Sequence, residues 1–253
     1  MHGNNGTDPI GQVATDAGFD SAGAITSLSS NPAFNRPMSI EVHMADITLL
    51  EVDCIVNAAN HTLSGGGGVD GAIHRAAGPG LRHECLQLPQ LRPGIRCATG
   101  EVQVTGGHGL GIRHVFHTVG PLWRDGRHDE QALLANCYWN CLKQAERLQL
   151  HSIAFPAISC GAYGFPVHLA CRIAATETVA WQKAHCHPLR ILLVAANNVT
   201  AQAFQQSLAS LGCPGSIIDQ GHFSPNPGRR RGGDMHSPAT HAFPLQPLRL
   251  AAP

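Results

Sequence analysis

The sequence has few charged residues and no excess of either sign. Charged residues make up 13% of the 253, against about 25% in a typical soluble domain, and 17 Lys and Arg balance 17 Asp and Glu. A hydrophobic content of 43% excludes a chain held open by charge repulsion. Zero net charge also argues against a broad basic surface that binds nucleic acid or an anionic membrane. We therefore expect a globular domain with neither as its main partner.

Long apolar segments are missing as well. Stretches such as Ile191–Ala196 fall far short of the about 20 residues that a transmembrane helix needs. The N-terminus has no basic flank followed by an apolar segment, so we expect no signal peptide. These absences predict a cytoplasmic protein without a membrane anchor.

The sequence also lacks paired cysteine motifs. Its nine cysteines include no CxxC pair, and most lie in apolar segments, as Cys54, Cys137, Cys141 and Cys171 do, where a free cysteine behaves as a small buried hydrophobe. Sixteen histidines raise the question of metal binding, but no cluster forms half of a recognised four-ligand pattern. We expect no metal site and no other cofactor. The tightest clusters are His83-x-Cys85, His114-x-x-His117 and His185-Cys186-His187.

Composition divides the chain into three parts. Residues 1–37 carry only four charged residues and no sustained periodicity, which is typical of a flexible extension. Residues 214–253 hold seven prolines and five glycines, a composition typical of disorder. Arg229–Arg231 in this tail are expected to be solvated rather than to bind a polyanion. Residues 38–213 are expected to fold as one domain.

Short apolar or β-branched segments alternate with helical patterns between residues 38 and 213. In residues 129–148 apolar residues recur at spacings of one, three and four, which predicts a helix with one apolar face. Residues 166–184 repeat that face after a proline suited to a first helical turn. Strands apolar on both faces and separated by helices indicate a three-layer α/β/α sandwich around a mixed, largely parallel sheet. The expected strands are residues 39–44, 54–58, 101–105, 114–119, 152–157 and 190–195.

The densest functional signal is the segment Asn57–Gly78. A strand ends in two amides, Asn57 and Asn60, four glycines follow at Gly65–Gly68, and a helix begins. Four consecutive glycines cost conformational entropy, which is expected where the backbone must come close to another group. The free backbone N–H groups at the start of a helix commonly bind phosphate. We interpret this segment as a phosphate cradle rather than a linker.

A second strand also runs into a glycine-punctuated loop, Ser159–Gly164, and then into a helix. In an open α/β sheet such loops leave the carboxyl ends of the strands, where ligands bind. Two phosphate-binding loops side by side fit a diphosphate better than a single phosphate.

Five motifs in order resemble those of the macrodomain family, and specifically its MacroD-type branch. They fall between residues 38 and 211, and the P-loop lysine pattern is absent, which excludes ordinary ATPases. The motifs are Ala45-Asp46-Ile47-Thr48, Asn57-Ala58-Ala59-Asn60, Gly65–Gly78, Thr118-Val119-Gly120-Pro121 and Phe155–Pro166.

The resemblance implies an enzyme that binds ADP-ribose and hydrolyses esters of its distal ribose, deacetylating O-acetyl-ADP-ribose and removing mono-ADP-ribose from acidic protein side chains. Asp46 would bind the adenine amine, with the Ile47 backbone beside it. Asn60 would hold the distal ribose hydroxyls, Asp70 would orient or deprotonate the attacking water, and Tyr163 would pack against the ribose. The other ligand-binding positions implied by the resemblance are Gly65, Gly66, Gly67, Gly68, Val69, Ser159, Cys160, Gly161, Ala162, Gly164 and Asn197.

Structural roles stand beside several of these functional ones. Asp70 at a helix start and Asp46 before Ile-Thr are also typical of cap or turn aspartates. Tyr163 is equally typical of a loop aromatic that closes a core. His74 is expected to pack or hydrogen-bond rather than catalyse. Cys160 stands where the family usually has Thr, so a reactive thiol in the loop is an open alternative.

Three positions depart from the family pattern. Ala45 replaces a usual Gly, and Ser64 replaces a common Leu. The sixth expected strand ends in Val194–Asn197, without the aromatic residue that many relatives have there. Loss of stacking on adenine is expected to weaken nucleotide binding by about 1–3 kcal/mol.

Two other functions stay open at this point. A non-catalytic reader of ADP-ribose groups needs only Asp46 and the two loops, whereas Asn60 and Asp70 together favour an enzyme. A protein that binds RNA or poly(ADP-ribose) through Arg229–Arg231 is disfavoured by the zero net charge.

Overall fold

The computed structural model describes residues 40–187 and 189–220. They form a seven-stranded sheet in the order β3-β4-β2-β5-β6-β1-β7, in which every neighbouring pair is parallel except β3 and β4. This is the mixed, largely parallel sheet that the sequence predicts. The strands are β1 (Ile40–Met44), β2 (Cys54–Ala58), β3 (Val102–Gly106), β4 (His114–Thr118), β5 (Ser152–Pro156), β6 (Arg190–Ala195) and β7 (Ile217–Asp219).

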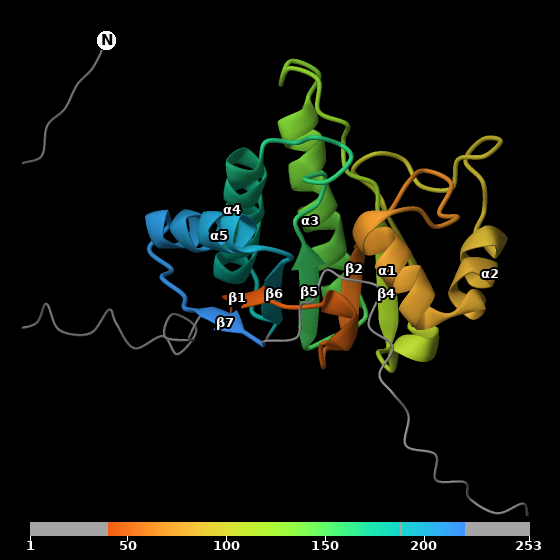
Figure 1. Ribbon diagram of the computed structural model, residues 1–253, viewed down its shortest axis with the longest axis horizontal. Helices are drawn as coiled ribbons and strands as arrows, with labels where there is room; N and C mark the ends of the chain where they lie inside the picture. The colour runs from red at the N-terminus through yellow and green to blue at the C-terminus, as the bar shows by residue number, and fades with distance from the viewer. Residues whose placement is uncertain (1–39, 188, 221–253) are drawn as a thin grey trace, which may run out of the picture.

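Helices cover both faces of the sheet (Figure 1). Successive strand residues point to opposite faces, so Val56 and Phe116 pack with α3, α4 and α5, while Ile55 and Val115 pack with α1 and α2. The expected three-layer α/β/α sandwich is confirmed. The helices are α1 (Gly68–Ala77), α2 (Pro79–Gln87), α3 (Glu130–Arg147), α4 (Val167–Ala184) and α5 (Asn198–Ser210), with short 3-10 helices η2 (Ile47–Leu49) and η3 (His108–Leu110).

The expected strands and the two expected helices lie within one residue of the observed bounds. The strand expected at 101–105 begins and ends one residue later, and α4 begins at Val167 with Pro166 as its N-cap. Cys54, Cys137, Cys141 and Cys171 are buried and free, as expected. Among the residues that the structure describes, no helix has the length and apolar character needed to span a bilayer.

The boundary expected after residue 213 is wrong for the residues that follow it directly. Ile217–Asp219 form β7, which pairs in parallel with Val42–Met44 of β1 and extends the sheet. Six of the seven prolines in residues 214–253 lie beyond residue 220, so the average composition concealed a short apolar segment able to pair with an exposed strand edge. The expected extension at 1–37 and the tail from 221 lie outside the described residues.

Candidate active site

The parallel sheet brings the predicted site residues to one edge. Asp46 follows β1, Asn60 follows β2, Ser159 follows β5 and Asn197 follows β6. The carboxyl ends of parallel strands lie at the same edge of a sheet, so these four loops surround a common region. The sequence expectation that the two glycine loops leave the same edge is confirmed.

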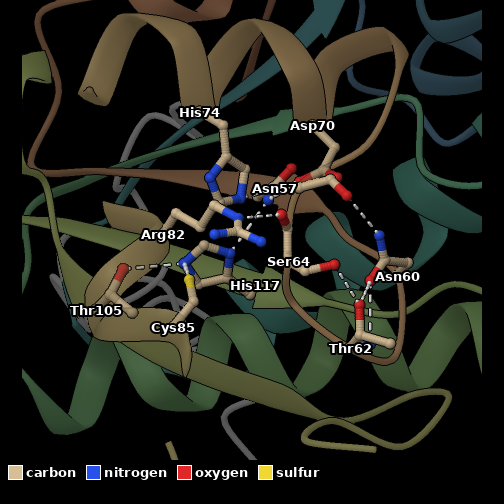
Figure 2. A network of polar contacts seen from close by, with 11 residues as sticks. Asn57, Asn60, Thr62, Ser64, Asp70, His74, Arg82, Cys85, Thr105 and His117 are labelled. Atoms are coloured by element: carbon tan, nitrogen blue, oxygen red, sulfur yellow. Dashed lines mark hydrogen bonds and ion pairs between the residues drawn. The ribbon is translucent and has the colours of Figure 1, made fainter. Parts of the chain in front are cut away.

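Asn60 shapes the first glycine loop from within (Figure 2). Its Oδ1 accepts hydrogen bonds from Thr62 N at 3.0 Å and from Thr62 Oγ1 at 2.7 Å. Its Nδ2 donates to the Gly65 carbonyl at 3.0 Å. Ser64 joins this arrangement, because its Oγ lies 2.6 Å from Thr62 Oγ1 and its carbonyl accepts from Arg82 Nε at 3.2 Å. Asn60 therefore has a structural role, whereas its contact with a ribose stays a prediction.

Glycines let this loop lie directly on α1. A Cβ on Gly66 would lie 2.9 Å from Asp70 Oδ2, and a Cβ on Gly71 would lie 2.5 Å from the Gly66 carbonyl oxygen. Gly67 and Gly68 are exposed, and a Cβ on either would meet no atom within 4 Å in the described structure. The inner part of the loop thus packs on the helix, while its outer part is accessible to a ligand.

Asp70 lies in the first turn of α1 but does not cap it. The N-cap is Gly67, with no side-chain cap bond, and Asp70 is only 5% exposed. Its Oδ1 accepts a hydrogen bond from Asn57 Nδ2 at 2.7 Å, and its Oδ2 faces Gly66. Burial raises the pKa of the Asp70 carboxyl, and the Asn57 hydrogen bond opposes that rise. The cap alternative is wrong, and the carboxylate is held beneath the loop.

A buried polar chain continues behind Asp70, and sequence reasoning assigned it no role (Figure 2). Asn57 Nδ2 also lies 3.1 Å from His117 Nδ1, and His117 Nε2 lies 2.9 Å from Thr105 Oγ1. Burial lowers the pKa of His117 to about 3, so its ring is neutral at physiological pH. The signal that could have found these residues is an uncharged polar side chain within a strand that is otherwise apolar.

Three side chains that could bind a metal lie close together beside these buried polar residues. One atom each of His74, Cys85 and His117 lie within 4.8 Å of one another. Both ring nitrogens of His117 already have hydrogen-bond partners, and burial raises the pKa of the Cys85 thiol to about 12. A metal at this trio would have to displace the thiol proton and these hydrogen bonds. The sequence clusters around Cys85 and His117 each contribute only one member of this trio.

The second loop is tied to its neighbours by backbone bonds. Ser159 has a left-handed φ of 65°, and its carbonyl accepts from Phe165 N at 3.0 Å. The Tyr163 carbonyl accepts from Trp123 N at 2.9 Å, which joins the loop to the segment after β4. Ser159 Oγ is buried and has no partner within the described part of the chain. Burial raises the pKa of the Cys160 thiol to about 11, which disfavours a reactive thiolate in this loop.

Asp46 and Asn197 both have cap roles in the structure. Asp46 Oδ1 accepts from Thr48 N at 3.0 Å and Thr48 Oγ1 at 2.7 Å as the N-cap of η2. Asn197 Oδ1 accepts from Thr200 N at 2.9 Å as the N-cap of α5. Ile47 is buried beside the first cap, and Val69 is half-buried in the first turn of α1. Their ligand contacts stay predictions.

A cavity of about 500 Å³ lies against the second loop. Tyr163 lines it together with His61 from the first loop and Gly120 from the end of β4. A larger cavity of about 700 Å³ lies at the opposite end of the strands, beside Asp53 and Ser152, and is lined by none of the predicted site residues. The smaller cavity is the one that adjoins the candidate site.

Sequence comparison decides the family. Residues 56–174 match the family model for the Macro domain. A macro domain-containing protein of Xanthomonas axonopodis pv. citri is 64% identical over 173 residues, which cover 68% of this chain and 97% of that protein. The chain belongs to the macrodomain family. An Escherichia fergusonii protein named O-acetyl-ADP-ribose deacetylase is 46% identical to this macrodomain over 173 residues, covering 68% of this chain and 97% of that protein.

Solved macrodomains have the same fold. A glycine-to-valine variant of the Oceanobacillus iheyensis macrodomain with ADPR is 40% identical and has a TM-score of 0.64, covering 68% of this chain and 92% of that chain. Variants of the Oceanobacillus protein with an asparagine or an aspartate ten positions further on replaced by alanine are also similar. Asn60 and Asp70 have this same spacing of ten in the present macrodomain.

Proposed function

We propose that this macrodomain binds ADP-ribose and hydrolyses esters of its distal ribose. The substrates would be O-acetyl-ADP-ribose and proteins that carry mono-ADP-ribose on acidic side chains. The observation that carries this proposal is the placement of Asp70. Its Oδ1 accepts a hydrogen bond from Asn57 Nδ2, and its Oδ2 faces Gly66 of the glycine loop. A carboxylate held in this way is suited to accept a proton from a water above it.

Both glycine loops support binding of a diphosphate. α1 begins at Gly68 without a side-chain cap, so its first backbone N–H groups are free to donate to an anion. α4 begins after the second loop, also without a side-chain cap. Ser159 Oγ adds a buried hydroxyl that lacks a partner within residues 40–187 and 189–220. Phosphate oxygens would satisfy such donors.

In the proposed reaction, water attacks the acyl carbonyl carbon while Asp70 Oδ2 accepts a water proton. Backbone N–H groups of the Gly65–Gly68 loop stabilise the developing oxyanion. The bond between the acyl carbon and the ribose oxygen then breaks, that oxygen takes up the proton, and the carboxylic acid leaves. The Escherichia fergusonii relative, whose name states this deacetylation, supports the proposal.

A non-catalytic reader is the second candidate. It is favoured by the internal bonds of Asn60, whose amide oxygen and nitrogen both hold the shape of the loop. A loop shaped in this way would serve binding alone as well as catalysis.

One purified sample tests the two candidates together. Calorimetry with ADP-ribose is expected to give a specific binding signal, with much weaker binding of AMP. Incubation with O-acetyl-ADP-ribose is expected to release acetate at a rate proportional to protein concentration. Binding without acetate release over hours would establish the reader, and no binding at millimolar ADP-ribose would overturn both candidates.

A further inference from the structure

The polar chain behind Asp70 is built by the register of the sheet. Asn57 of β2 and His117 of β4 are direct partners across the parallel pair, so their side chains lie on the same face. Thr105 of β3 pairs with Val115, two residues before His117, and lies on that face as well. All three side chains are buried, with exposures of 0%, 0% and 2%. Water therefore does not compete for their hydrogen bonds.

The chemistry of the groups determines where the protons lie. An amide nitrogen only donates, so His117 Nδ1 must accept from Asn57 Nδ2, and the proton of the neutral ring is on Nε2. His117 Nε2 then donates to Thr105 Oγ1 at 2.9 Å, and Thr105 Oγ1 donates to the Gly106 carbonyl at 3.3 Å. Each donor in the chain has an acceptor, which fixes the direction of every bond.

This direction in turn fixes the amide of Asn57. Its Nδ2 has two hydrogens, one for His117 Nδ1 and one for Asp70 Oδ1. Its Oδ1 is buried and has no partner in the part of the chain that the structure describes. Turning the amide over would leave its oxygen against a carboxylate and an imidazole lone pair, which is less favourable still. The two acceptors therefore hold the amide in one orientation.

We propose that Asn57 is a positioning residue that holds Asp70 Oδ1, so that Oδ2 faces the glycine loop, and that His117 and Thr105 fix the Asn57 amide in its donating orientation. This inference rests on the proposed function, in which Asp70 Oδ2 takes the proton of the attacking water. None of the three residues needs to touch the substrate.

Other titratable and charged groups surround Asp70 without replacing this contact. On α1, His74 Nε2 lies 3.4 Å from Asp70 Oδ1. From α2, the Cys85 thiol lies near His117, and Arg82 donates to the Ser64 carbonyl. Only Asn57 makes a hydrogen bond below 3 Å to the Asp70 carboxylate among the described residues. A charge-assisted bond of this kind favours the ionised carboxylate.

Thr105→Val is the decisive variant, because it changes a hydroxyl into a methyl group at the far end of the chain. His117 Nε2 then keeps only the weak acceptor Cys85 Sγ, at 3.6 Å, so the ring favours the tautomer with its proton on Nδ1. That proton would oppose the Asn57 donor and release the amide. We expect kcat on O-acetyl-ADP-ribose to fall about 10-fold with KM within about 2-fold, because positioning rather than binding is lost.

The pH profile separates positioning from general damage. Asn57 stabilises the ionised form of Asp70, so a weakened bond raises the pKa of Asp70, and the acid limb of the kcat profile moves to higher pH. Thr105→Ser keeps a hydroxyl and is expected to restore both rate and profile. Thr178→Val is the matched control, because Thr178 is buried on the opposite face and its Oγ1 donates to the Ala174 carbonyl within α4. It is expected to leave both unchanged.

An NMR titration of the Asp70 carboxyl carbon gives a readout that does not need activity. We expect Thr105→Val to raise the Asp70 pKa and Thr178→Val to leave it unchanged. If the unaltered protein releases no acetate but this contrast is found, the proposed hydrolase fails and the positioning contact stands. If the protein is active and the two valine variants agree in rate, pH profile and titration, the positioning role is overturned.

Discussion

Beneath the candidate site the two faces of the sheet differ in chemistry, although neighbouring residues of the same strands form them. Val56 and Phe116 point to the α3–α5 face, where they join an apolar core. The next residues, Asn57 and His117, point to the α1–α2 face and form the hydrogen-bonded chain behind Asp70. One face stabilises the domain by packing, and the other combines a second apolar cluster around Ile55 and Val115 with buried polar groups that need hydrogen-bond partners. In β2 and β4, one residue along the strand thus separates the α3–α5 core from the candidate chemistry.

Phe116→Ala should give the largest effect and tests the apolar face. Deleting a fully buried phenylalanine leaves a cavity, and we expect the free energy of unfolding to fall by about 3–5 kcal/mol. Urea unfolding followed by circular dichroism measures this change. The folded fraction should keep its deacetylation rate, because Phe116 points away from Asp70. A loss of rate per folded molecule would show that the two faces are not independent.

Asp70→Asn tests the polar face with little change of shape. Loss of the proton acceptor should lower kcat on O-acetyl-ADP-ribose by at least ~10², while ADP-ribose affinity changes by less than ~10-fold. Stopped acetate assays and calorimetry measure the two quantities. Asp129→Asn is the matched control, because Asp129 is exposed and its left-handed φ of 59° suits asparagine. An unchanged rate in Asp70→Asn would remove Asp70 from the proposed mechanism.

Asp46→Ala is expected to have a smaller effect, limited to binding. Loss of a charge-assisted hydrogen bond to adenine should weaken ADP-ribose binding by about 1.5–3 kcal/mol. Asp46 also caps η2, so Asp46→Asn serves as the control that keeps an acceptor for Thr48 N and removes only the charge. We expect Asn to retain thermal stability and to bind with intermediate affinity. Unchanged affinity in the alanine variant would leave Asp46 with its cap role alone.

Sequence patterns located the parts of this molecule that depend on local order. The strands, α3, α4 and the two glycine loops follow from periodicity and from runs of residues that are neighbours in the chain. The hydrogen-bonded side chains from Asp70 through Asn57 and His117 to Thr105 do not follow from local sequence patterns. The register of β2, β3 and β4 brings together residues that are 12 to 60 positions apart. The strand β7 was missed because composition was averaged over a longer segment.

The same comparison explains why the sequence alone does not distinguish an aspartate that caps a helix from an aspartate that is held in the candidate site. Asp46 and Asp70 each stand at the start of a helix, yet one bonds to a backbone N–H and the other to a buried amide from β2. Nothing in the local pattern distinguishes these two environments, because the difference lies in what the sheet places beneath each residue.

Chelator treatment should have the smallest effect and tests the polar face for a metal. Both ring nitrogens of His117 are already hydrogen-bonded, and a metal at its trio with Cys85 and His74 would have to displace those bonds and the Cys85 thiol proton. We therefore expect dialysis against EDTA to leave both the deacetylation rate and the melting temperature unchanged. Elemental analysis of the unaltered protein and of Cys85→Ala should find the same low zinc content, with Cys186→Ala, at an exposed cysteine, as the control. Zinc that copurifies in stoichiometric amount and is lost only in Cys85→Ala, together with a rate that EDTA abolishes and zinc restores, would show that the trio is a metal site. The polar face would then hold its buried groups through a cation instead of through the register of the strands.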